Sequence, residues 1–346
     1  MSERKEEARK VQMTGGSTYI ISLPKDWVTK MKIKPGTSLI LRRMEDSSIQ
    51  ILPPGVQETR KPTEALVRVS PEDNMFKVAR KVISLYLVGN NVIRIVPSDG
   101  KLTHNHRDVI KNLIREKLIG TEVIMDSAEE MTLQVLLSYP ELSVKDALRR
   151  MFLVASAMQE ESVGALEKFD KGAAEEVMKT DNEVDRFNMY VVRQIKLAVQ
   201  DPRFIKEIGL RDARDCLGYR LIVKSVERIA DHGALIAEKV KLLNKPVDKE
   251  VIKNIRTMSE FANSLLRKSE SAVFKEEYET AEGVIEQKKR ITDLEDKVIK
   301  SISGVSKEDA INIRLIAESL RRIAEYSSDI AEVVLNLTVS TNGATS

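Results

Sequence analysis

Two related stretches decide the fold of this chain: ERIADHGALIAE at residues 227–238 and RRIAEYSSDIAE at residues 321–332. They share small, apolar and acidic positions in register, and their apolar residues recur at the spacing of one helix face. The segments that precede them also align loosely, residues 181–185 with residues 288–292. Because such an internal repeat indicates a duplicated helical unit, the sequence predicts two tandem three-helix bundles.

The C-terminal part of the chain is nearly all helical in pattern. An Asp-Pro pair and a Lys-Pro pair interrupt it, and Ser143, Asp248 and Ser306 are expected to cap helices. The six predicted helices span residues 143–169, 171–200, 210–243, 248–274, 277–303 and 306–337. We assign residues 143–245 to the first bundle and residues 247–338 to the second.

The segment of residues 62–140 alternates between strand and helix patterns in the order β-α-β-α-β-β, which is typical of a small α/β module. The predicted strands span residues 66–69, 92–96, 122–125 and 132–137, and the predicted helices span residues 71–87 and 105–118. The pattern indicates packing or spacing for this module and no particular chemistry.

Residues 1–55 have the pattern of short strands around one short helix, which begins near Pro24 with Ser22 as its expected cap. The predicted strands span residues 11–13, 19–23, 38–42 and 49–52. A core of this size is marginal in isolation, so we expect two copies to complete one barrel as a homodimer. The predicted fold class is thus multi-domain and mainly α, with a β-barrel unit, an α/β module and two bundles.

The composition narrows the class of protein. The chain has a single cysteine, Cys216, which excludes an internal disulfide and lies in a helical pattern expected to be core. Neither a signal-peptide core nor an apolar run long enough to span a membrane is present in the sequence. We therefore expect a soluble, cytoplasmic protein without a membrane span.

Two acidic pairs are candidate metal ligands. Asp181 and Asp185 are four residues apart on one predicted helix, and Glu227 and Asp231 are four apart on another. Residues at this spacing share a helix face, so two packed helices could bring four carboxylates to one site. Oxygen ligands of this kind suit Mg²⁺, Mn²⁺, Ca²⁺ or iron.

An ordinary alternative is that these carboxylates lie on a solvated helix face, with Arg186 and Arg228 as their partners. His232 is expected at a helix surface or interface, since the Glu-x-x-His motifs of di-iron bundles are missing. His104 and His106 are expected to be exposed. The sequence also lacks phosphate-binding loops, dinucleotide fingerprints and hydrolase or kinase signatures, which argues against an enzyme.

The basic residues of the N-terminal unit are the second candidate site. Residues 1–53 carry ten Lys or Arg against six Asp or Glu, and two copies could line one face against DNA phosphates. An equally simple interpretation is an ordinary solubilising surface. The candidate DNA-binding residues are Arg9, Lys10, Lys25, Lys30, Arg42 and Arg43.

Residues 8–53 resemble the SpoVT/AbrB swapped-hairpin family. The resemblance lies in Arg9-Lys10-Val11-Gln12 on the first strand, in ISLPKDWV at residues 21–28 and in IKPGTSL at residues 33–39. It implies an intertwined dimeric barrel that binds DNA through Arg9, Lys10, Lys25 and Lys30. The turn at residues 14–17 departs from the family because it lacks the arginine common in DNA-binding members, so the resemblance favours dimerisation over base-specific recognition.

Residues 143–338 resemble the PhoU family of phosphate-uptake regulators, and the whole chain resembles archaeal PhoU-like regulators that join both modules. The family's metal motif, Glu/Asp-x-x-x-Asp, matches the pair Asp181 and Asp185 and the pair Glu227 and Asp231. In the second repeat Arg321 takes the place of Glu227, and only the weaker candidates Glu325 and Asp329 remain. The resemblance thus implies a divalent metal or iron in the first bundle and a doubtful site in the second.

These resemblances imply a regulator of phosphate uptake that is not an enzyme. It would bind DNA as a transcriptional regulator, or act as an accessory protein on a phosphate ABC transporter subunit or a signalling protein. Two alternatives stay open: a dimeric metal-binding adaptor that does not bind DNA, and a carboxylate-bundle metalloenzyme.

Overall fold

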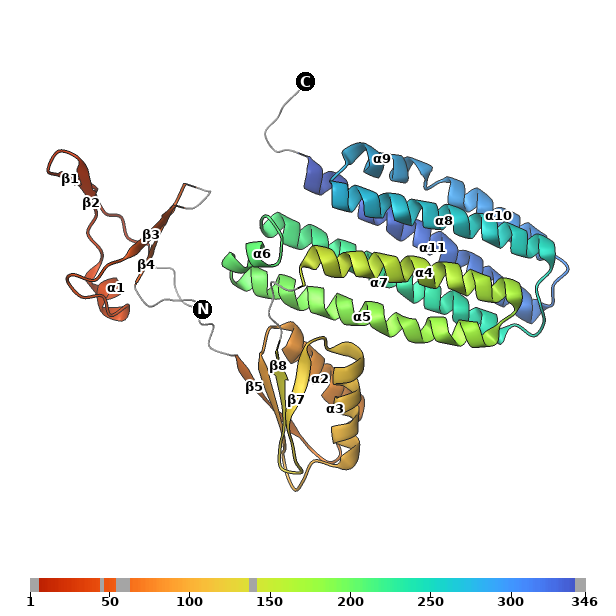
Figure 1. Ribbon diagram of the computed structural model, residues 1–346, viewed down its shortest axis with the longest axis horizontal. Helices are drawn as coiled ribbons and strands as arrows, with labels where there is room; N and C mark the ends of the chain where they lie inside the picture. The colour runs from red at the N-terminus through yellow and green to blue at the C-terminus, as the bar shows by residue number, and fades with distance from the viewer. Residues whose placement is uncertain (1–5, 44–46, 54–62, 137–141, 340–346) are drawn as a thin grey trace. The chain divides into compact units, whose positions relative to one another are not determined.

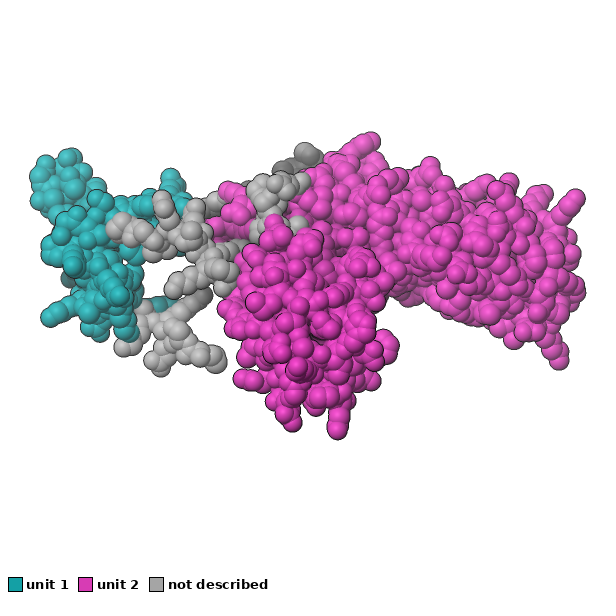
Figure 2. Space-filling view, turned by 60° about the horizontal axis from the view of Figure 1, so that its bottom comes forward, with its two compact units in different colours: residues 1–61 teal, residues 62–346 magenta. Residues whose placement is uncertain are grey.

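The computed structural model describes residues 6–43, 47–53, 63–136 and 142–339. The chain divides into two compact units, residues 1–61 and residues 62–346 (Figure 2). The domain edges predicted at residues 55, 62 and 140 lie outside the described residues. The predicted fold class is confirmed: a small N-terminal strand unit precedes an α/β module and a large helical region (Figure 1).

The N-terminal unit consists of two short hairpins and one helix. Strands β1 (Gln12–Thr14) and β2 (Thr18–Ile20) pair antiparallel, as do β3 (Ile40–Arg43) and β4 (Ile49–Leu52). Helix α1 (Lys25–Lys30) begins after Pro24, not after Ser22, and no side chain caps it. The predicted Ser22 cap is therefore wrong, because Pro24 occupies the cap position and its carbonyl accepts the first hydrogen bond of the helix, from the Val28 amide at 3.1 Å.

The α/β module is a four-stranded sheet with the strand order β5-β6-β8-β7. The only parallel pair in it is β5 and β6. Helices α2 (Met75–Leu87) and α3 (His104–Lys117) cover one face of the sheet (Figure 1). Helix α2 begins later than predicted because Asn74 caps it by accepting a hydrogen bond from the Phe76 amide at 2.9 Å. The strands are β5 (Glu64–Val69), β6 (Val92–Pro97), β7 (Thr121–Asp126) and β8 (Met131–Val135).

The helical region forms two bundles. The first contains α4 (Val144–Lys168), α5 (Lys171–Gln200), the short α6 (Arg203–Glu207) and α7 (Ala213–Leu242). The second contains α8 (Lys249–Lys275), α9 (Tyr278–Gln287), α10 (Arg290–Ser301) and α11 (Lys307–Thr338). Helix α6 was not predicted, and the single helix predicted over residues 277–303 is interrupted at Lys288 and Lys289.

The predicted caps of the bundles are confirmed at two of three positions. Ser143 accepts a hydrogen bond from the Asp146 amide at 3.1 Å, and Ser306 accepts one from the Asp309 amide at 3.3 Å. Asp248 occupies the cap position of α8 without a side-chain hydrogen bond to the helix. Two of the three long helix starts predicted from Ser or Asp are thus fixed by the local motif itself.

Both bundles share one apolar core, and close helix contacts hold them together. Cys216 is fully buried in this core, as predicted. At Gly233 an added Cβ would lie 3.2 Å from Met158 Cβ of α4, and at Gly218 it would lie 2.7 Å from Leu337 Cδ2 of α11. Glycine at these two positions lets the long helices approach one another closely.

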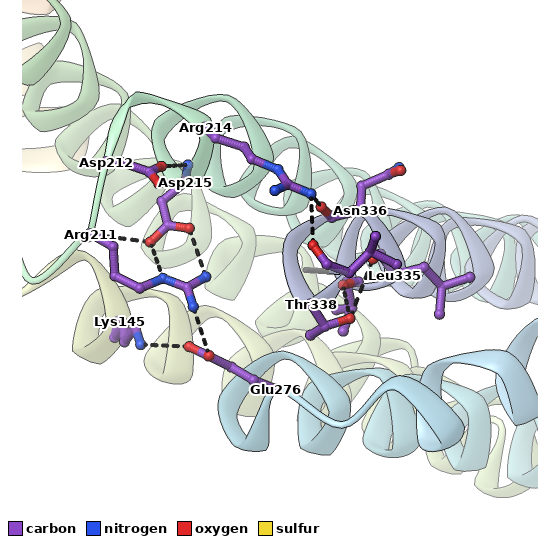
Figure 3. A network of polar contacts seen from close by, with 11 residues as sticks. Lys145, Arg211, Asp212, Arg214, Asp215, Glu276, Leu335, Asn336 and Thr338 are labelled. Carbon is purple, nitrogen blue, oxygen red and sulfur yellow. Dashed lines mark hydrogen bonds and ion pairs between the residues drawn. The ribbon is translucent and has the colours of Figure 1, made fainter. Parts of the chain in front are cut away.

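A polar network also crosses between the bundles at one end (Figure 3). Arg211 forms two hydrogen bonds of 2.9 Å and 2.8 Å to the buried carboxylate of Asp215, and its remaining NH donates to Glu276 at 3.0 Å. Glu276 belongs to the second bundle and also lies 3.4 Å from Lys145 of α4. Because Asp215 is buried, the guanidinium both neutralises it and links it to the second bundle.

The α/β module packs against α5 of the first bundle through a buried arginine. The Arg193 side chain is fully buried and donates hydrogen bonds to the carbonyl of Tyr86, in the last turn of α2, and to those of Gly89 and Asn90, in the loop between α2 and β6. It also donates to Asn91 Oδ1 at 2.7 Å. A guanidinium buried in this way satisfies several carbonyls at once, so it fixes the loop to the bundle.

Candidate metal centre and nucleic-acid interface

Three of the four predicted carboxylates of the first bundle converge. Asp185 of α5 and Glu227 and Asp231 of α7 each offer an oxygen within 4.8 Å of the others. Asp181 lies one helical turn before Asp185, and its charge acts on Asp231. Two adjacent helices therefore bring three of the four carboxylates together, and the fourth is close enough for its charge to act on Asp231.

The electrostatics of the cluster favour a cation. Burial, followed by repulsion from Glu227, Asp181 and Asp185, raises the pKa of Asp231 to about 7. Burial and then the charge of Asp185 raise the pKa of Asp181 to about 6. Because the pKa values of Asp181 and Asp231 are raised, full ionisation of the four carboxylates is unfavourable unless a positive charge is added to the cluster.

Two lysines supply part of the missing positive charge. The Lys117 ammonium of α3 forms an ion pair with Asp185, and Lys224 Nζ lies 2.6 Å from Glu227 Oε1. The partners considered at first, Arg186 and Arg228, do not fill this role among the described residues. Arg186 Nε is buried without a hydrogen bond, and the Arg228 guanidinium lies 5.4 Å from the Tyr326 ring centroid.

Neither lysine was predicted from the sequence as a partner of the carboxylates. The spacing could have indicated the pair of Lys224 and Glu227, because a lysine three residues before a glutamate shares its helix face. Lys117 carried no such signal, since it lies on another module and meets Asp185 only in the folded chain.

The residues present fit a hard divalent cation or iron. All candidate ligands are carboxylate oxygens, and Asp181 Oδ1 is buried without a hydrogen-bond partner. Buried polar oxygens normally have a partner, so an orphan beside three converging carboxylates is the pattern expected where a cation completes the set.

The corresponding place in the second bundle holds an arginine. Arg321 lies 3.1 Å from Glu295 of α10 and also forms an ion pair with Glu325. Arg322 lies 2.6 Å from the other oxygen of Glu325, and Asp329 is exposed. The weaker candidates Glu325 and Asp329 thus do not form a cluster of unpaired carboxylates, because the guanidinium groups of Arg321 and Arg322 neutralise Glu325.

The three histidines lie in different environments. His232 lies at the α7–α11 interface against Tyr326, with ring centroids 5.8 Å apart, and burial lowers its pKa to about 4. His104 is exposed as predicted, 3.3 Å from Asp108. The predicted exposure of His106 is wrong: it is 1% exposed, because its ring tucks beneath the start of α3 and its Nδ1 lies 2.8 Å from Thr103 Oγ1.

The basic candidates of the N-terminal unit are all at its surface. Arg9 forms an ion pair with Glu7, while the remaining five have no ion pair among the residues the structure describes. They lie just before β1, on α1 and on β3. The exposed candidates are Arg9, Lys10, Lys25, Lys30, Arg42 and Arg43.

The same unit has almost no interior of its own. Pro24 is its one buried residue in the ranges 6–43 and 47–53, and several large apolar side chains are more than half exposed. Exposed large apolar side chains in such number are typical of a surface that binds another chain. These side chains are Val11, Met13, Tyr19, Ile40, Leu41 and Ile49.

Two α-helical bundles related by an internal repeat, with an acidic cluster on α5 and α7, define the class of this protein. The PhoU domain model matches residues 148–240 and 255–334, and the model described as "Antidote-toxin recognition MazE, bacterial antitoxin" matches residues 12–58. The chain belongs to the PhoU domain family, with two tandem copies and a MazE/AbrB-like N-terminal unit.

Two bacterial proteins and one crystal structure illustrate what this chain is similar to. A "phosphate-specific transport system accessory protein PhoU homolog" of Clostridium acetobutylicum is 24% identical over 55% of this chain and 88% of its own length. A protein of the same name from Aquifex aeolicus is 26% identical over 49% of this chain and 75% of its own length. The crystal structure of the phosphate transport system regulatory protein PhoU from Streptococcus pneumoniae aligns with a TM-score of 0.49 and 19% identity, over 56% of this chain and 92% of that one.

Among the described residues, no helix is both long and apolar enough to span a membrane. The long helices are instead amphipathic, with one face in the shared core and charged residues on the other.

Proposed function

We propose that this protein is a cytoplasmic, dimeric regulator of phosphate uptake that acts by binding other molecules and not by catalysis. Membership of the PhoU domain family and relatives named as phosphate-transport accessory proteins support the phosphate role. The helical bundles would engage a component of a phosphate ABC transporter or a signalling protein. The N-terminal unit would dimerise and contact DNA.

The observation that carries the dimer is the exposed apolar surface of the N-terminal unit. Burial of Met13, Tyr19, Leu41 and Ile49 against a second copy would give each half the core that it lacks alone. Both hairpins then belong to one closed structure, and the basic residues of two copies double their positive field. This arrangement suits the DNA backbone, whose phosphates attract arrays of Lys and Arg.

DNA binding is tested by titrating the full chain against the upstream DNA of its phosphate-transport genes at two salt concentrations. We expect the affinity to fall with salt and to fall further in the double variant Lys25→Ala/Lys30→Ala, because each phosphate contact releases counterions. The matched control is Lys245→Ala, a lysine outside the N-terminal unit. Absence of binding at the lower salt concentration would favour the alternative of a dimeric adaptor that does not bind DNA.

The acidic cluster would hold a divalent cation or iron that stiffens the contact between α5 and α7. The supporting observations are the converging oxygens of Asp185, Glu227 and Asp231 and the orphaned oxygen of Asp181. Mn²⁺ binding followed by electron paramagnetic resonance tests this role directly. Asp231→Asn is expected to abolish binding and Asp329→Asn to leave it intact; equal binding by both variants would place the cation elsewhere.

A further inference from the structure

A pocket of about 350 Å³ lies where the α/β module meets the first bundle. Its wall includes Lys111 and Arg115 of α3, Thr121 and Glu122 of β7, and Arg186 of α5. A second pocket, of about 460 Å³, shares Arg115 and Arg186. The two arginines therefore come from different modules and lie at the junction of two hollows.

The positive groups of this junction are incompletely neutralised. Lys111 forms an ion pair with Asp126, whereas neither Arg115 nor Arg186 has an ion-pair partner among the residues described. Acidic residues also line the junction: Glu183 forms an ion pair with Arg150 at 2.8 Å, and Glu116 of α3 and Glu122 of β7 are exposed. The guanidinium groups of Arg115 and Arg186 thus line the pockets without an ion-pair partner among the described residues.

Two buried polar groups at the pocket also lack partners. Thr121 is 3% exposed, and its hydroxyl makes no hydrogen bond. Arg186 Nε is likewise buried without an acceptor. Because buried donors are normally satisfied, two unsatisfied donors in the wall of one pocket support an acceptor-rich ligand at this place.

We propose that this junction binds a small anion that bears a phosphate group. Guanidinium groups bind phosphate oxygens through paired, charge-assisted hydrogen bonds, and a hydroxyl such as that of Thr121 adds a third donor. The pocket volume lies at the lower end of the range for small-molecule sites, so it admits a phosphomonoester as well as inorganic phosphate. The proposal does not depend on DNA binding or on a cation at the acidic cluster.

The bound anion would connect the two modules. Arg115 moves with α3 and Arg186 moves with α5, so a phosphate held by both adds a contact between the α/β module and the first bundle. This gives the α/β module a role for which its sequence pattern carried no sign: half of a ligand site.

The test is isothermal titration of the full chain, without added metal and at constant ionic strength, with inorganic phosphate, adenosine monophosphate and sulfate. We expect phosphate or the monophosphate to bind, and Arg115→Gln and Arg186→Gln each to weaken binding about tenfold or more, the loss of one charge-assisted hydrogen bond. Arg80→Gln, an exposed arginine on α2, is the matched control and should bind like the unaltered chain. Tighter binding of the monophosphate would identify an ester as the ligand, and tighter binding of phosphate would identify the free anion.

Circular dichroism and thermal unfolding establish that the arginine variants fold. Thr121→Val, which keeps the side-chain shape and removes the hydroxyl, supplies a second variant that is expected to weaken binding. The proposal is overturned if none of the three anions binds at millimolar concentration, or if binding is equal in the unaltered chain and in all variants.

Discussion

The ammonium group of Lys117 forms an ion pair with the carboxylate of Asp185, although the two residues belong to different modules. Lys117 ends α3 of the α/β module, and Asp185 lies in the middle of α5 beside Glu227 and Asp231. The side chain of a neighbouring module thus acts as an internal cation at the acidic cluster. A bound metal ion would compete with it for the same oxygen.

Replacing Lys117 with alanine should strengthen the binding of Mn²⁺. The substitution frees Asp185 from a partner that the metal must otherwise displace, and a partly exposed ion pair is worth about 1 kcal/mol, which is roughly a fivefold gain in affinity. Titration followed by electron paramagnetic resonance measures the change. Lys101→Ala, an exposed lysine of the same module, is the control; equal affinities in both variants would show that Lys117 does not compete.

The metal-free protein should lose stability as the pH rises from about 4 to about 7 through Asp231. Its pKa is about 7 in the folded chain and about 3.9 when unfolded, so in this window the folded state binds the additional proton. Deprotonation then favours unfolding, and the loss is complete above pH 7. Urea unfolding in the presence of a chelator measures the slope.

Asp231→Asn removes this titration while keeping the shape of the side chain. The stability of the variant relative to the unaltered chain should therefore grow across the same pH window and level off above it. A constant difference between pH 4 and pH 8 would contradict the raised pKa.

Replacing Arg193 with methionine should destabilise the chain by about 3 kcal/mol or more. The change removes the guanidinium donor from the carbonyls of Tyr86, Gly89 and Asn90 and from Asn91 Oδ1. The Tyr86 and Gly89 carbonyls keep a second donor, whereas Asn90 O and Asn91 Oδ1 lose the arginine on which they depend, and each such orphan costs roughly 1–3 kcal/mol. Chemical denaturation measures the free energy of unfolding. Lys196→Met, at an exposed position of the same helix, is the matched control and should change stability little; an equal effect of the two would mean that the buried guanidinium contributes nothing.

Replacing Arg321 with methionine should destabilise the second bundle by about 1–3 kcal/mol. The carboxylates of Glu295 and Glu325 then lose their shared cation, which leaves charged groups at this position without their partner. Chemical denaturation measures the free energy of unfolding, with the exposed Arg314→Met on the same helix as control. An equal effect of the two variants would show that the ion pairs of Arg321 contribute nothing to stability.

Much of the fold follows from local patterns. The boundaries of α4, α5, β4 and β6 lie within one or two residues of the predicted ranges, because capping residues, prolines and apolar periodicity act over a few residues. The interruption between α9 and α10 was not predictable in this way. Lys288 and Lys289 keep helical backbone angles, and neither glycine nor proline marks the position.

The amino-acid sequence by itself determined the repeat, the three-part organisation and the pairing of Asp181 with Asp185 and of Glu227 with Asp231, since i, i+4 geometry is a property of any helix. Tertiary structure alone decided which charges meet. It brought Lys117 to Asp185, buried Arg193 and His106, and placed Arg115 and Arg186 in the wall of one pocket. The physical reason is that burial and Coulomb energy depend on distances between segments far apart in the chain, and packing sets those distances while sequence spacing does not.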